Sequence, residues 1–129
     1  MMMQEDLAAQ ANYEASLAAF ERAGDTFGRS VALSALGGLA TRQRDFSAAR
    51  ALFEESVFLS RQISAQPHTL PSRWRLVDVE LGIRLSLRGL ADVLDAEGQP
   101  ERAARLNAAA AAAGQQLSLR QAIELAIAA

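Results

Sequence analysis

The chain has 129 residues, a formal net charge of −2 and no cysteine. This length suits one domain with a buried core, and the lack of cysteine excludes disulfides and thiol chemistry. The basic residues form no stripe, so the electrostatic footprint of a nucleic-acid-binding protein is missing. No apolar run approaches the roughly 20 residues that span a bilayer, and the start, MMMQED, lacks both regions of a signal peptide. We therefore expect a cytoplasmic protein that binds neither nucleic acid nor membrane.

Helical periodicity runs through most of the chain. Alanine, the best helix former, dominates the apolar half of the composition. Glycine and proline fall mostly between the periodic segments, where they interrupt helices. The sequence predicts an all-α fold, a single domain over residues 1–129, with about six antiparallel helices. Their predicted bounds are 4–22, 26–43, 46–64, 73–97, 100–113 and 118–128.

The first two predicted helices are separated by Gly24 and Asp25. Glycine suits the position just after a helix, and aspartate is a good N-cap for the next one. The helix 4–22 carries one apolar stripe. The helix 26–43 is expected to bury five apolar residues, namely Phe27, Val31, Leu36, Leu39 and Ala40.

A glycine pair, Gly37 and Gly38, lies in the middle of the second predicted helix. Each glycine destabilises a helix by about 1 kcal/mol relative to alanine. Close approach of a neighbouring helix is the favoured explanation, because no Cβ stands in the way. A flexible hinge is the alternative.

The third and fourth predicted helices flank the one long loop. Asp45 is expected to cap the helix 46–64, whose apolar stripe is Phe46, Ala49, Phe53, Val57 and Ile63. Two prolines in the following SAQPHTLPS segment break helical geometry. The first half of helix 73–97 is apolar on more than one face, so it must be covered from two sides or form an interface.

The last two predicted helices carry local start signals. Pro100 follows Gly98 and suits the first turn of helix 100–113, where its missing N–H is not needed. That helix is rich in alanine and has a weak apolar stripe. Ser118 and Gln121 form a capping box that starts the helix 118–128.

Leu33 to Ile63 reads as a helical hairpin, and the flanking segments repeat parts of it, as in solenoids. The pattern is carried in order by Leu33, Leu36, Gly37, Ala40, Phe46, Ala49, Phe53 and Ser56. With these residues the chain resembles the tetratricopeptide repeat (TPR) family. The resemblance extends in part to residues 87–110, and it implies a short right-handed solenoid. Arg44 stands where the family's turn has glycine.

A narrower resemblance concerns the C-terminal part. GLADVLDAEGQPERAARLNAAAAAAG and the closing GQQLSLRQAIELAIA are similar to the end of the repeat region in large bacterial regulators, the LuxR-type and adenylate-cyclase-linked ATPase proteins. In those proteins the repeats form a sensor or scaffold arm beside an ATPase and an output domain. This sequence has neither a phosphate loop nor a helix-turn-helix, so it resembles a detached arm.

No pattern in the sequence predicts a catalytic residue, a cofactor or a metal. His68 is the only histidine, and a general base needs an orienting partner that cannot be named here. We interpret it as a solvated loop residue. No cluster of histidine and acidic residues has the spacing of metal ligands.

The TPR resemblance implies that the first helix of each hairpin lines a concave groove. The residues that would face this groove are Ser34, Gly38, Thr41, Arg42, Arg88, Asp92 and Asp95. From this set we take Thr41, Arg42, Arg88 and Asp92 as candidate partner-binding residues. An ion pair between Arg88 and Asp92 is the alternative.

Trp74 completes the candidate partner-binding set. It lies between two arginines, and tryptophan and arginine are favoured at interface hot spots. The alternative is that it packs on the proline-containing loop or on the helix 46–64.

Three functions remain open from the sequence. The first is a non-catalytic protein-interaction or scaffold module that binds a peptide or helix in its groove. The second is a homodimer that pairs helix 4–22 and the first half of helix 73–97 across a two-fold axis. The third is a small-molecule sensor or enzyme with an apolar pocket between helices.

Overall fold

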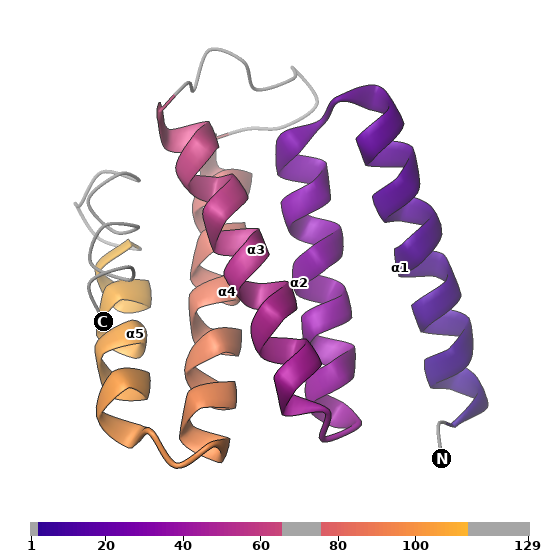
Figure 1. Ribbon diagram of the computed structural model, residues 1–129. Coiled ribbons are helices and arrows are strands. Elements are labelled where there is room, and N and C mark those ends of the chain that lie inside the picture. Colours follow the sequence, from indigo (N-terminus) through magenta and orange to yellow (C-terminus); the bar gives the residue numbers. More distant parts are fainter. Residues whose placement is uncertain (1–2, 66–75, 114–129) are drawn as a thin grey trace.

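The computed structural model describes residues 3–65 and 76–113 (Figure 1). Within them the chain forms five α-helices and no strand, which confirms the all-α prediction. The helices are α1 (Gln4–Ala23), α2 (Thr26–Arg42), α3 (Phe46–Ala65), α4 (Leu76–Ala96) and α5 (Pro100–Ala113).

The predicted bounds agree with the described helices to within one residue wherever both can be compared. α1 and α3 each extend one residue further than predicted, and α2 and α4 each end one residue earlier. The predicted helix 118–128 and the first three residues of predicted helix 73–97 lie outside the described ranges.

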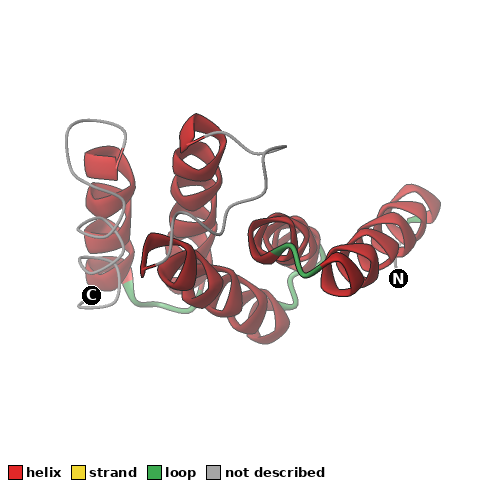
Figure 2. Cartoon of the chain, turned by 90° about the horizontal axis from the view of Figure 1, so that it is seen from above, coloured by secondary structure: helices red, strands yellow, loops and turns green. Residues whose placement is uncertain are grey.

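Each helix packs against the next in the chain, and α2 also contacts α4. Consecutive helices run in opposite directions (Figure 1), so α2 and α4 are parallel to each other. Seen along the helices, α3 lies to one side of α2 and α4, with α1 and α5 at the two ends (Figure 2). The centre of the molecule is therefore the junction of α2, α3 and α4.

Local signals set the first helix boundaries as predicted. Gly24 adopts the left-handed conformation after α1, with φ of 68°. The Gly28 N–H donates to Asp25 Oδ1 over 2.9 Å at the start of α2. The Ala48 N–H donates to Asp45 Oδ1 over 3.2 Å at the start of α3. Both aspartates are thus N-caps that satisfy a free helix N–H group.

The turn between α2 and α3 holds Arg44 in the left-handed region, with φ of 60°. This conformation costs a residue with a Cβ about 1–2 kcal/mol. The Arg44 guanidinium lies 5.5 Å from the centre of the Phe46 ring, which offsets part of that energy at an exposed site. The side chain thus occupies the position for which glycine is best suited.

Replacing Arg44 with glycine is expected to raise the free energy of unfolding by about 0.5 kcal/mol, because relief of strain exceeds the lost ring contact and the added chain entropy. Arg44→Val is expected to lower it by about 1 kcal/mol or more, since a β-branched residue resists positive φ. Urea unfolding of both variants measures the difference. Equal stability of the two would contradict the assignment of strain to this turn.

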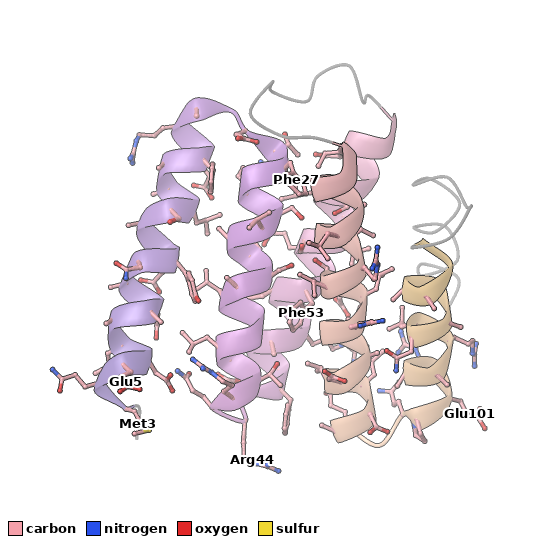
Figure 3. All side chains as sticks on the ribbon, turned by 180° about the vertical axis from the view of Figure 1, so that it is seen from behind. Met3, Glu5, Phe27, Arg44, Phe53 and Glu101 are labelled. Carbon is pink, nitrogen blue, oxygen red and sulfur yellow. The ribbon has the colours of Figure 1, made fainter. Side chains whose placement is uncertain are left out.

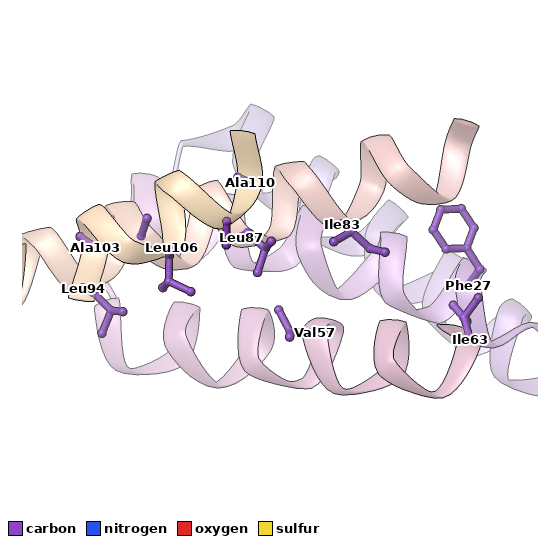
Figure 4. Close-up of a cluster of buried hydrophobic side chains, with 11 residues drawn as sticks. Phe27, Val57, Ile63, Ile83, Leu87, Leu94, Ala103, Leu106 and Ala110 are labelled. Atoms are coloured by element: carbon purple, nitrogen blue, oxygen red, sulfur yellow. The ribbon is translucent and has the colours of Figure 1, made fainter. Parts of the chain in front are cut away.

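The buried apolar residues form two adjoining clusters around the central junction. The larger joins α4 and α5 to α2 and α3, with Leu87, Ala91 and Ala110 fully buried (Figure 4). The smaller surrounds Phe53 and includes Ala49 and Val93. The weak apolar stripe of α5 is sufficient to hold this helix in the fold, because its alanines and Leu106 pack directly on α4.

One prediction about burial is wrong. Val31, expected in the core, is 38% exposed. In sequence Val31 lies between Phe27 and Ser34. Those two side chains turn inward, whereas the Val31 side chain faces solvent. The apolar stripe of α1 buries no residue completely, because α1 contacts α2 and no other described helix.

Glycine brings helices close to phenylalanine rings at several points. A Cβ at Gly89 on α4 would lie within 3.0 Å of three ring atoms of Phe53, and a Cβ at Gly37 on α2 would lie 3.0 Å from the same ring. The Phe53 ring is therefore enclosed by glycines from two helices. A Cβ at Gly38 would have no atom within 4 Å. The close-approach explanation thus holds for Gly37 and not for Gly38.

Candidate interaction surface

One set of at least partly exposed residues on α2 and one such set on α4 follow the same spacing. On α2 they are Val31, Ala35, Gly38 and Arg42, and on α4 they are Leu81, Leu85, Arg88 and Asp92. Each set advances by four, three and four residues, which keeps it on one side of an α-helix. Leu81 is 48% exposed and Leu85 is 55% exposed.

The two sets lie side by side. Gly82 approaches the Phe27 ring, and the Ser34 and Ser86 hydroxyls are hydrogen-bonded. Val31, which lies between Phe27 and Ser34 on α2, is therefore level with Leu85 on the parallel helix α4. Figure 3 shows the molecule from the side on which α2 and α4 lie in front of α3. We call the eight residues of both sets the α2–α4 face.

The α2–α4 face is apolar at one end and charged at the other. Val31, Leu81 and Leu85 form the apolar end, and Arg42, Arg88 and Asp92 follow toward the C-terminal ends of the two helices. Exposed apolar side chains that are grouped and rimmed by charge are typical of interaction surfaces.

The predicted site residues of α2 have partners within the chain. The Thr41 hydroxyl donates to the Gly37 carbonyl over 2.9 Å, within its own helix. The Arg42 guanidinium donates to Asp6 Oδ1 on α1 over 2.8 Å. Arg42 therefore ties the end of α2 to the start of α1, although its side chain remains 64% exposed.

Arg88 and Asp92 are both exposed on α4. Among the described residues, no ion pair joins them to each other or to a third side chain. The alternative in which they pair is therefore wrong, and both charges are accessible on the α2–α4 face. Trp74, the remaining predicted site residue, lies outside the described ranges.

Ser34 does not face a groove, as the resemblance implied, but joins a cluster of serine hydroxyls between α2, α3 and α4. Its hydroxyl lies 2.9 Å from the Ser56 hydroxyl on α3 and is hydrogen-bonded to Ser86 on α4. We call this set the serine cluster; its members are Ser30, Ser34, Ser56, Ser60 and Ser86.

Ser56 is the centre of the serine cluster. Its Oγ lies 2.9 Å from Ser30 Oγ and 3.0 Å from Ser86 Oγ, and it donates to the Ser30 carbonyl over 3.0 Å. Ser60 and Ser86 also donate to carbonyls one turn back in their own helices. Each hydroxyl therefore has a partner although four of the five serines are buried, as buried polar groups require.

The sequence contains a signal for the serine cluster, but an analysis of apolar residues alone does not detect it. Ser30 and Ser34 are four residues apart, as are Ser56 and Ser60, and both pairs fall on the apolar faces of their helices. Small polar residues at this spacing place hydroxyls in line along a helix interface.

Arg50 on α3 connects this helix to the residue that follows α4. Its guanidinium lies 2.9 Å from Glu54 and 3.6 Å from Glu97, just after α4. The hydrogen bond that Arg50 donates to Glu54 is the main cause that raises its pKa above the ordinary value, and the charge of Glu97 adds to it. Glu54 is thus part of an ion-pair network, although its side chain is 52% exposed.

Neither a metal cluster nor a membrane span occurs in the described ranges. Over residues 3–65 and 76–113, no group of three or more histidine and acidic side chains is placed to hold a metal ion. In the same ranges, none of the helices combines the length and apolarity needed to cross a membrane.

Comparison with known proteins yields no match, whether to a family model, to a curated protein or to a solved structure.

Proposed function

We propose that this chain is a TPR-like helical-repeat module that binds another polypeptide and performs no catalysis. The supporting observation is the α2–α4 face, where Leu85 and Leu81 are about half exposed beside Val31. The antiparallel hairpins and the contact between the parallel helices α2 and α4 agree with stacked repeats. In this proposal the chain serves as a scaffold or sensor arm of a bacterial regulator.

The partner segment in this proposal is an amphipathic helix. Its apolar stripe covers Val31, Leu81 and Leu85, and its charged residues meet Arg88 and Asp92, which carry opposite charges and no partner among the described residues. Helices that lie on such faces anchor through residues spaced by three and four. Arg42 contributes as a rim residue that already binds Asp6.

Replacing Leu85 with glutamate is expected to weaken partner binding and leave the fold intact. The side chain is 55% exposed, so the free energy of unfolding should change by no more than about 0.5 kcal/mol, while a charge buried under a partner weakens binding by about tenfold or more. Tagged protein retains the partner from extract, and binding is then measured by calorimetry with both proteins purified.

The matched control is Phe58→Glu, which introduces the same charge at an equally exposed apolar position on α3. We expect this variant to bind as the unchanged chain does. Equal weakening by both substitutions, or by neither, would contradict the placement of the interface on the α2–α4 face.

A homodimer is the second candidate function. Two observations favour it: α1 buries no residue, with Leu7 54% exposed, and the first half of α4 exposes Leu81. Light scattering at micromolar concentration separates the two proposals. A monomer would exclude the dimer. If the chain is a dimer and Leu81→Glu converts it to a helical monomer, homodimer assembly would become the leading proposal in place of the interaction module.

A further inference from the structure

A pocket of about 210 Å³ opens between α1, α2 and α3, away from the α2–α4 face. Its apolar floor includes Leu36 and Leu39 of α2 and Leu52 of α3. On α2 the lining residues Leu36 and Ala40 point well away from Val31 and Arg42, as the helical spacing requires. It is large enough for one long side chain and too small for a folded element.

Acidic groups stand at the rim of this pocket. Glu14 of α1 lines it, and so does Asp45 in the turn before α3. Gln10 donates to Glu14 Oε1 over 3.0 Å and so holds that carboxylate in place. Asp45 Oδ1 accepts the Ala48 N–H. Within the described part of the chain, neither carboxylate forms an ion pair.

The nearby cations are engaged elsewhere. Arg42 binds Asp6, Arg44 lies over the Phe46 ring, and Arg50 binds Glu54 and Glu97. The pocket therefore keeps its negative rim. Gln43 also lines the pocket. Its side-chain Nε2 is buried without a hydrogen-bond partner among the described residues.

We infer that this pocket binds an arginine side chain of a partner polypeptide. The guanidinium would reach Glu14 and Asp45 while the methylene stem covers Leu36, Leu39 and Leu52, a combination that suits arginine. This inference rests on the proposed function only in that both require a polypeptide partner.

The test is a titration of the ¹⁵N-labelled chain with acetyl-Ala-Arg-Ala-amide, followed by amide chemical shifts. We expect saturable changes at Leu36, Leu39 and Ala48 with a dissociation constant of roughly millimolar size, as for one anchoring residue. Acetyl-Ala-Gln-Ala-amide should bind at least about tenfold more weakly. Binding of the two peptides with equal affinity, or no saturable change with either, would overturn the inference.

Two paired variants show whether the carboxylates are responsible. The double variant Glu14→Gln, Asp45→Asn should weaken the arginine peptide about tenfold or more, and asparagine still caps α3. The control, Glu55→Gln with Asp95→Asn, makes the same change of charge at exposed positions outside the pocket and should leave binding unchanged. An equal loss in the control would assign the effect to overall charge and overturn the inference.

A third ligand and a third variant distinguish a peptide site from a small-cation site and from the α2–α4 face. Argininamide alone should bind more weakly than the peptide, because it lacks the flanking backbone; equal affinity would indicate a site for a small cation and contradict a peptide site. Leu85→Glu should not change the titration. The pocket and the α2–α4 face can therefore fail independently of each other.

Discussion

Gly89→Ala is expected to lower the free energy of unfolding by up to about 2 kcal/mol, although alanine is the better helix former. The new methyl group would lie within 3.0 Å of three Phe53 ring atoms. The ring cannot retreat, because Gly37 of α2 is in close contact on another side. Overpacking of a rigid core costs about 1–3 kcal/mol, which exceeds the roughly 1 kcal/mol gained in helix propensity. Urea unfolding with a fixed m-value provides the measurement.

Gly38→Ala is the matched control for this prediction. It is the same substitution in the interior of a helix, but its methyl group would have no neighbour within 4 Å. We expect it to raise the free energy of unfolding by up to about 1 kcal/mol. If both substitutions shift stability in the same direction, Phe53 is not held between α2 and α4 as described.

Ser56→Val is expected to lower the free energy of unfolding by about 2–4 kcal/mol. The substitution removes the hydroxyl that lies within 3.0 Å of Ser30, Ser34 and Ser86, so buried donors lose an acceptor. It also adds a methyl group at a fully buried position between three helices, which overpacks the core. Ser56→Ala removes the hydroxyl without added volume and should cost about 1–2 kcal/mol.

A double-mutant cycle shows whether the serine cluster acts as a unit. Ser56→Ala and Ser86→Ala should be non-additive by at least about 0.5 kcal/mol, because their hydroxyls are in contact. Ser16→Ala, at an exposed position in the middle of α1, is the control and should change stability by less than about 0.5 kcal/mol. Additive effects at Ser56 and Ser86 would show that the hydroxyls contribute independently.

Phe53 and the serine cluster both bear on the proposed interaction surface. Each joins α2 to α4 through α3, at Gly37 with Gly89 and at Ser34 with Ser86. Because hydroxyls and an enclosed ring tolerate little sliding, they fix the level of Val31 relative to Leu85. The position of the α2–α4 face thus depends on buried contacts that no partner touches.

Part of the candidate site could be predicted from the sequence. The repeat pattern places Arg88 and Asp92 on an exposed face of α4, and the structure agrees. The same pattern places Arg42 on the exposed side of α2, but its ion pair with Asp6 depends on how α1 packs. The pocket rim combines Glu14 and Asp45, which are far apart in the chain, so no local pattern indicates it.

For the five described helices, the sequence by itself determined where they lie and, to within one residue, those ends that can be compared. Alanine content and apolar periodicity specify helices through interactions within three or four residues, and Gly24, Asp25 and Asp45 act on the adjacent turn. Only the tertiary structure decided which small residues contact a neighbouring helix and which are exposed. Gly37 meets a ring and Gly38 meets solvent, and Ser34 meets hydroxyls of two other helices. The rotation of one helix against another sets these outcomes, and that rotation depends on side chains distant in sequence.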